Sequence, residues 1–219
     1  MIKQILIAML STIIILLVAL IILCAQVVAA PLPSDFDKDS SFLHGIIIDP
    51  GVKGYNPAGV TTDVVKFRKT LDAQFAAHPD HIDIHIASGG GMVTPLTLDL
   101  LSQLEKWNAD GVVVRCYVTE LAASLAAAFL SRCGERYADP LAIILWHSVR
   151  AILPPGTILT QFDFEEGAAS AAAQNKILWA PLRELIDDDE MFDKALRLET
   201  PWPAMALAAR YPKALQVVD

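Results

Sequence analysis

Short apolar runs alternate with segments of helical spacing along most of this chain, and this alternation constrains the fold more than any other feature. Ile82, Ile84 and Ile86 share one face of a predicted strand. Residues 94–107, which follow, have the apolar spacing of an amphipathic helix, and a second apolar run occupies residues 112–118. Strands that alternate with helices predict an α/β fold with a mainly parallel sheet, whose functional groups lie at the carboxyl ends of the strands.

The remaining predicted elements continue this pattern in a single domain at residues 43–219, preceded by a polar, turn-rich tether at residues 31–42. The other predicted strands cover residues 45–49, 141–147 and 215–218. The other predicted helices cover residues 62–77, 122–133, 164–185, 188–198 and 204–211.

Residues 5–25 carry no charge and are rich in Ile and Leu, so that as a helix they span about 31 Å, roughly one hydrocarbon core. Only Lys3 and the amino terminus precede this run, which favours a cytoplasmic N-terminus and an extracytoplasmic domain. We expect residues 1–30 to be a transmembrane anchor. The small residues at 27–30 leave open a cleaved signal segment and a secreted domain.

The net charge and the cysteines indicate which partners and which cellular compartment are compatible with this chain. The net charge is -8, from 25 acidic and 17 basic residues, and no Lys/Arg cluster is present, so nucleic acid is not expected as a partner. Cys116 and Cys133 fall in the predicted domain. An exported compartment permits a disulfide between them, but we expect two buried thiols.

Three features in chain order predict serine hydrolase chemistry. The strand at residues 81–87 leads into three glycines, Ser124 opens a small-residue segment, and His147 ends an apolar run. A serine hydroxyl needs a base to take its proton, and its tetrahedral intermediate needs donors aimed at the oxyanion. The Leu125 amide lies next to Ser124, and Gly91 lets backbone approach a substrate. Singly, these residues are more typical of packing positions, so the prediction rests on their combination.

The same residues carry a resemblance to a known family. The run Ile86-Ala-Ser-Gly-Gly-Gly-Met-Val-Thr94 resembles the glycine loop of the Clp protease proteolytic subunit (ClpP). Ala122-Ala-Ser-Leu125 resembles its nucleophile motif, and residues 137–147 are similar to the strand that presents its base. The resemblance covers roughly residues 43–219. It implies a ClpP/crotonase-like fold of repeated β-α units.

By this resemblance, Ser124 is the nucleophile, His147 is the base, and Gly91, Gly90 and Leu125 are the oxyanion-hole positions. The family's acid falls in a late loop, where Thr200 stands at the aligned position.

Glu199 is the nearest carboxylate and takes the acid's place after a shift of one residue. Asp193 and Asp163 are further candidates, and a dyad without an acid is the remaining alternative. Gly89 stands where the family has a proline, and Glu120-Leu121 stands where it has a Gly-Gln pair. We expect the Glu120 side chain to face solvent.

The resemblance implies a serine endopeptidase that acts on peptide or protein substrates without a metal or organic cofactor. It also implies a homo-oligomer, because the family forms rings, whereas nothing in the chain supplies an ATPase. Related membrane peptidases use a serine-lysine dyad, but here no lysine stands where a base is needed.

Other functions compete with this prediction. One alternative is a ClpP-like scaffold that binds peptide without cleaving it, which would explain the missing aspartate. A second alternative is a crotonase-like protein that handles acyl-CoA thioesters, because such proteins share the fold. His81, Asp83 and His85 share a strand face near His78 and raise the alternative of a metal site, although a polar strand face explains them better. The triple glycine lacks the spacing of phosphate-binding loops.

Overall fold

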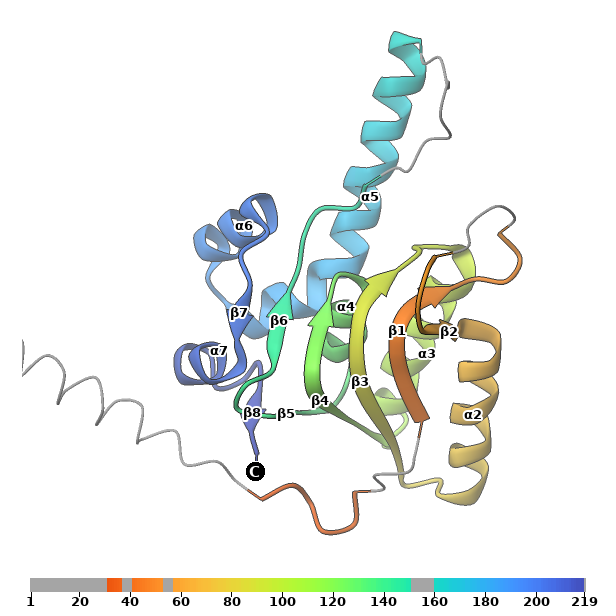
Figure 1. The fold of residues 1–219 in the computed structure, drawn as a ribbon, viewed down its shortest axis with the longest axis vertical. Helices are drawn as coiled ribbons and strands as arrows, with labels where there is room; N and C mark the ends of the chain where they lie inside the picture. The colour runs from red at the N-terminus through yellow and green to blue at the C-terminus, as the bar shows by residue number, and fades with distance from the viewer. Residues whose placement is uncertain (1–30, 37–40, 53–56, 151–159, 219) are drawn as a thin grey trace, which may run out of the picture.

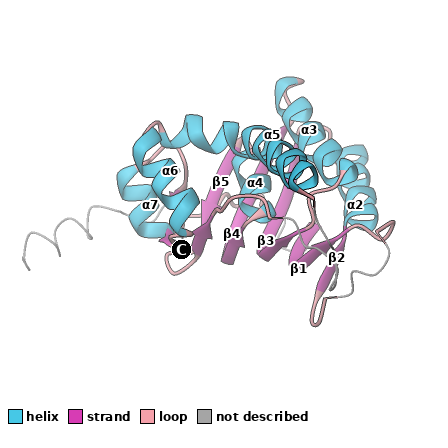
Figure 2. Cartoon of the chain, turned by 90° about the horizontal axis from the view of Figure 1, so that it is seen from above, coloured by secondary structure: helices cyan, strands magenta, loops and turns pink. Residues whose placement is uncertain are grey.

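The structure is a computed structural model that describes residues 31–36, 41–52, 57–150 and 160–218. Helices cover one face of a single sheet, as Figure 1 and Figure 2 show. The strands are β1 (Ser41–Ile48), β2 (Thr61–Asp63), β3 (His81–Gly91), β4 (Val113–Ala123), β5 (Glu135–Ala138), β6 (Ile143–Leu145), β7 (Trp202–Pro203) and β8 (Gln216–Val217). The helices are α2 (Val64–Ala77), α3 (Pro95–Ala109), α4 (Leu125–Ser131), α5 (Gln161–Ile186), α6 (Asp189–Leu198) and α7 (Ala204–Arg210).

The sheet has the strand order β2-β1-β3-β4-β5-β8, and β6 extends it by pairing with both β4 and β7. Every pairing is parallel except the one between β6 and β7. The predicted α/β fold with a mainly parallel sheet is therefore confirmed. The core lies between the sheet and the helices, and it includes the fully buried Ile82, Ile84 and Ile86 of β3.

Strand pairing moves several predicted boundaries. Ala122 and Ala123 were expected in a helix, but they belong to β4 because they pair with Ile144 and Leu145 of β6. Alanine has the highest helix propensity, but intrinsic propensity is a weak prior that a ladder with a neighbouring strand overrides. For the same reason the glycine run is the end of β3, paired with β1, rather than a free turn. Residues 61–63 form β2 instead of starting a helix.

The predicted tether is partly a packed element. Phe36 is buried, and its ring meets the rings of His85 and Tyr117 on β3 and β4. Arg115 of β4 donates to Asp35 at 2.9 Å and is also bound at two points by the buried Asp83. Burial acts to lower the pKa of Arg115, but these hydrogen bonds outweigh it and raise the pKa, so the guanidinium stays charged.

Residues 1–30, which include the predicted anchor, lie outside the described residues. Within the described ranges, no helix has the length and apolar character needed to cross a membrane.

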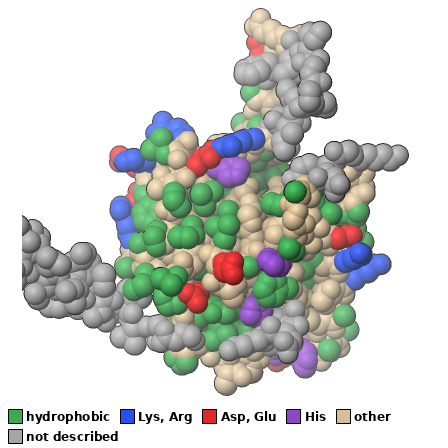
Figure 3. Space-filling view, viewed as in Figure 1, with side chains coloured by type: hydrophobic (Ala, Val, Ile, Leu, Met, Phe, Trp, Pro, Cys, Tyr) green, Lys and Arg blue, Asp and Glu red, His purple; other side chains and the backbone are tan. Residues whose placement is uncertain are grey.

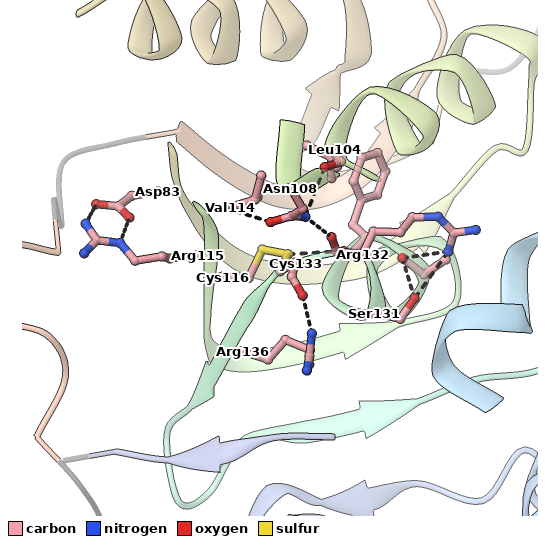
Figure 4. The surroundings of a disulfide bond; sticks show 12 residues. Asp83, Leu104, Asn108, Val114, Arg115, Cys116, Ser131, Arg132, Cys133 and Arg136 are labelled. Atoms are coloured by element: carbon pink, nitrogen blue, oxygen red, sulfur yellow. Dashed lines mark hydrogen bonds and ion pairs between the residues drawn. A yellow bond between two sulfur atoms is a disulfide. The ribbon is translucent and has the colours of Figure 1, made fainter. Parts of the chain in front are cut away.

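The expectation of two free thiols is wrong, because Cys116 and Cys133 form a disulfide with a Cα–Cα distance of 5.9 Å (Figure 4). Cys116 lies on β4, and Cys133 follows α4, so the bridge joins the strand before Ser124 to the end of the helix after it. Their separation in the folded chain was not readable from the sequence, because a strand end and a helix lie between them. Asn108 of α3 adds hydrogen bonds to the carbonyl of Arg132 and the amide of Val114 beside this bridge.

The end of α4 is also tied to α5. Pro181 inside α5 has no N–H to offer the carbonyl of Ile177 one turn earlier. The side chain of Arg132 donates to that carbonyl and to the carbonyl of Leu178, both at 2.8 Å. Burial lowers the pKa of Arg132, and the charge of Glu105 opposes this effect. The Arg132 side chain thus supplies a donor to the carbonyl that Pro181 leaves without one, and it holds the end of α4 in place.

Replacing both Cys116 and Cys133 by alanine is expected to lower the free energy of unfolding by about 3 kcal/mol, because the bridge closes a loop across a sequence separation of 17. Urea unfolding of the parent and the double variant measures this difference. Reductant should destabilise the parent and leave the double variant unchanged. Equal urea midpoints for the oxidised parent and the double variant would contradict the disulfide.

Candidate active site

Ser124 occupies the sharp turn between β4 and α4 in a backbone conformation that L-residues rarely adopt. Its φ is 55° and its ψ is −126°. Such a conformation costs on the order of 1–3 kcal/mol and persists only where the surroundings enforce it. A strained strand-to-helix turn that carries a serine is the geometry of a nucleophile elbow, in which the hydroxyl is lifted clear of the sheet. The Ser124 side chain makes no helix-capping hydrogen bond.

Two contacts enforce this turn. The Ser124 N–H donates to the carbonyl of Leu145 on β6 at 2.9 Å. On the other side, Gly90 of β3 packs so closely that a Cβ there would lie 2.5 Å from the Ser124 Cβ and 2.9 Å from the Leu125 nitrogen. Gly90 itself has a φ of 94°. Only glycine fits this position, because the space is closed and the backbone is left-handed.

The predicted oxyanion positions surround the same turn. Leu125 begins α4, where the first N–H groups of a helix have no partner within the helix, and its nitrogen faces Gly90. The Gly90 N–H donates to the Ser88 hydroxyl at 3.1 Å, so it already has an acceptor. Gly91 packs against the backbone of Ile47 on β1. Leu125 and Gly91 are therefore the better candidates for oxyanion donors, and their role stays a prediction.

His147 follows the strand next to Ser124. Ala123 pairs with Leu145 in the parallel β4–β6 ladder, so both chains leave the sheet at the same edge, and parallel strands lie about 4.8 Å apart. The half-buried His147 ring has its Nδ1 2.7 Å from the carbonyl oxygen of Ser148. No hydrogen bond joins Ser124 to His147 in the described part of the chain. Catalytic hydrogen bonds commonly tighten only when substrate is bound.

Trp146, the residue before His147, anchors the chain at this edge of the sheet. Trp146 is fully buried and stacks on Phe192 of α6 and on Trp202 of β7. Its indole N–H donates to the Phe192 carbonyl at 3.4 Å. Because successive residues of an extended chain point to opposite sides, a buried Trp146 directs His147 to the opposite side. This anchor was not identified as part of the site from the sequence.

Glu199 lies three residues before Trp202 of β7, and His147 lies three residues after Ile144, the residue with which Trp202 pairs. The β6–β7 pairing itself covers Ile143 with Pro203 and Ile144 with Trp202. Glu199 is the left-handed cap that ends α6. Its carboxylate, however, forms an ion pair with Arg150 rather than with the histidine.

The other acids considered for the triad have separate roles. Asp193 is paired with Arg183. Asp163 accepts hydrogen bonds from Thr160 at the start of α5, which lower its pKa. Thr200 donates its N–H to the carbonyl of Ala195 and so belongs to the end of α6.

The strand face that raised the metal alternative is occupied by other contacts. Asp83 binds Arg115, and His85 lies among the rings of Phe36, Phe42 and Tyr117. Across the described ranges, no three His, Cys, Asp or Glu side chains gather in a way that could hold a metal ion. Glu120 is exposed, as expected.

Arg150 is the site residue that the sequence reasoning missed. It stands three residues after His147 without a recognisable motif, and it meets Glu199 at the end of α6.

The comparisons with known proteins do not assign the chain to a family. No protein-family model matches it, and no curated protein matches it. The resemblance to ClpP therefore stays a prediction that rests on the residues named above.

The Gly90→Ala substitution is expected to destabilise the domain by about 3 kcal/mol or more, because the new methyl group meets Ser124 in closed space and the backbone is left-handed. Gly89→Ala is the matched control, since a Cβ there meets only the end of Ile46 at 3.7 Å. Thermal unfolding of both variants tests the packing. Equal melting temperatures for the two would contradict it.

Ser124→Gly and Ser124→Ala separate strain from chemistry. Both remove the hydroxyl, but glycine relaxes the backbone at φ 55° whereas alanine does not. The glycine variant is expected to be more stable than the alanine variant by about 1 kcal/mol. Urea unfolding measures the difference. A less stable glycine variant would show that the turn is unstrained.

Proposed function

We propose that this protein is a serine hydrolase that cleaves peptide bonds, with Ser124 as the nucleophile and His147 as the general base. The observation that carries the proposal is the strained elbow of Ser124, held at the sheet edge where the chain that bears His147 also emerges. Strain of this kind is concentrated at functional sites, because the fold must compensate for it elsewhere. The order of Gly91, Ser124 and His147, and the resemblance of their surroundings to ClpP, support the same chemistry.

The proposed reaction follows the serine hydrolase scheme. Nε2 of His147 takes the proton of the Ser124 hydroxyl as its oxygen attacks the peptide carbonyl. The resulting oxyanion accepts hydrogen bonds from the amides of Leu125 and Gly91. The C–N bond then breaks as His147 returns the proton to the leaving amine. A water molecule, activated by the same histidine, hydrolyses the acyl-enzyme and restores the serine.

The surface beside the base favours substrates with apolar side chains. Hydrophobic side chains gather over β6, β7 and α7 on the face seen in Figure 3, whereas Lys and Arg lie toward its margins. Ile143 and Leu145 of β6 are half-buried, and Leu141 just before them is 85% exposed. An extended peptide with apolar residues would bury part of this surface.

We further propose that the domain works outside the cytoplasm, either anchored through residues 5–25 or secreted after their removal. The Cys116–Cys133 disulfide supports this placement, because such bonds persist in oxidising compartments. The chain would act as a homo-oligomer, since a site open to any protein outside the cell would cleave indiscriminately.

A fluorophosphonate probe tests the nucleophile directly, because it reacts with activated serines. The full chain, purified in mild detergent, is expected to be labelled, and Ser124→Ala and His147→Ala should both lose the label. Ser131→Ala is the matched control, because Ser131 lies at the other end of α4, where its hydroxyl donates to the Ala128 carbonyl and accepts from Arg132. A folded parent that takes up no probe would contradict the proposal.

A peptide-binding scaffold without turnover is the second candidate. It is favoured by the ion pair between Glu199 and Arg150, because among the described residues no carboxylate then contacts His147. This candidate predicts that peptides bind to an unlabelled parent, which isothermal calorimetry would measure. A crotonase-like activity predicts instead the turnover of acyl-CoA thioesters.

A further inference from the structure

The backbone carbonyl of Ser148 is the group that contacts the Nδ1 edge of the His147 ring. The distance between Nδ1 and this oxygen is 2.7 Å. A carbonyl oxygen can only accept a hydrogen bond, so Nδ1 must carry the proton. Neutral histidine has one protonated nitrogen, and Nε2 is therefore left with a free lone pair. This is the tautomer that a general base needs in order to take a proton from serine.

The carbonyl is itself held by a side chain from α5. Ser148 C=O and Val149 N–H belong to one planar peptide unit, in which the two groups point in opposite directions. The Val149 N–H donates to Oδ1 of Asn175 at 2.7 Å. Fixing the N–H therefore fixes the direction of the carbonyl. Val149 also packs against the hydrophobic core, which limits rotation of this peptide further.

The carboxylate that would otherwise orient the base is occupied. Glu199 is the carboxylate nearest to the position of the family's acid, but its ion pair is with Arg150. The proton on Nδ1 thus has a neutral acceptor, and the acid is held by a neighbouring cation.

We propose that Asn175 is a positioning residue that, through the Ser148–Val149 peptide, holds the His147 ring in the tautomer and orientation of a general base. The inference rests on the proposed function for its catalytic meaning, but the orientation of the ring can be measured without activity. Asn175 does not contact the substrate or the reacting atoms. Glu199 is not required for the base, so the chain operates a serine-histidine dyad supported by backbone.

The test compares Asn175→Ala with Asn175→Asp in the full chain. Aspartate keeps an oxygen that accepts from Val149, whereas alanine removes it. Alanine is expected to lower kcat/KM for a fluorogenic peptide by about 10- to 100-fold, which is less than most of the 10²–10⁴ that a general base contributes, because the base itself remains. Aspartate should restore the rate to within a few-fold of the parent. Equal rates for the alanine variant and the parent, with a folded alanine variant, would overturn the proposal.

Nitrogen-15 NMR of the histidine rings gives a readout that does not depend on turnover, and a His147→Gln spectrum assigns the signal. The parent and Asn175→Asp should show protonated Nδ1 and bare Nε2, and Asn175→Ala should show a mixture of tautomers. An unchanged tautomer in the alanine variant would overturn the proposal even if the parent proved inactive. If only the proposed function is wrong, the parent and the variants will show this tautomer pattern, but the parent will not be labelled by the fluorophosphonate probe.

Glu199→Gln provides a second variant that does not disturb α5. The dyad predicts a change in kcat/KM of less than about 10-fold and an unchanged His147 tautomer. If Glu199 oriented the base, the loss would approach 10⁴, as when a triad aspartate is neutralised. A loss of that size would overturn the proposal.

Discussion

The strained backbone of Ser124 is the constraint around which the rest of the domain is arranged. A residue at φ 55° and ψ −126° returns to an ordinary conformation unless its neighbours prevent it. Here β6 holds the Ser124 amide through Leu145, and β3 brings Gly90 against its Cβ. The disulfide closes the loop that contains the turn, and Arg132 fixes the far end of α4. Leu145 and Gly90 come from strands distant in sequence, so the turn depends on the assembled sheet.

The base is placed by a different set of contacts on the same edge. Trp146 is buried between Phe192 and Trp202, which sets the depth of the chain just before His147. Asn175 holds the peptide just after it. The histidine is thus bracketed by a hydrophobic anchor and a hydrogen bond. Its orientation depends on how α5 and α6 pack against β6, which places the long helices among the determinants of the chemistry.

Periodicity in the sequence predicted the longer strands of the sheet, but it missed β2, β5 and β7 and several strand ends. The alternation of Ile82, Ile84 and Ile86 correctly predicts β3, because burial on one face imposes a period of two. The end of β4 was missed, because Ala122 and Ala123 have no strand preference of their own and are held by β6. Phe36 was assigned to a tether, since nothing local indicates that it packs under Arg115.

The candidate site was also predicted only in part. Ser124, His147 and the glycines were predicted from their order and from the resemblance to ClpP, and the structure brings Ser124, Gly90 and Leu125 together at one turn. The partner of Glu199 could not be predicted, because Arg150 is far from it in the sequence and no motif links the two residues. The disulfide could not be predicted either, because the local sequence does not show how close Cys116 and Cys133 lie in the fold.

A crystal structure of the full chain after reaction with a phosphonate would show whether Ser124 is the nucleophile. We expect a phosphorus atom bonded to the Ser124 hydroxyl oxygen, with a phosphonyl oxygen within hydrogen-bonding distance of the Leu125 and Gly91 amides and Nε2 of His147 facing the adduct. An unmodified Ser124, or an adduct on another residue, would contradict it.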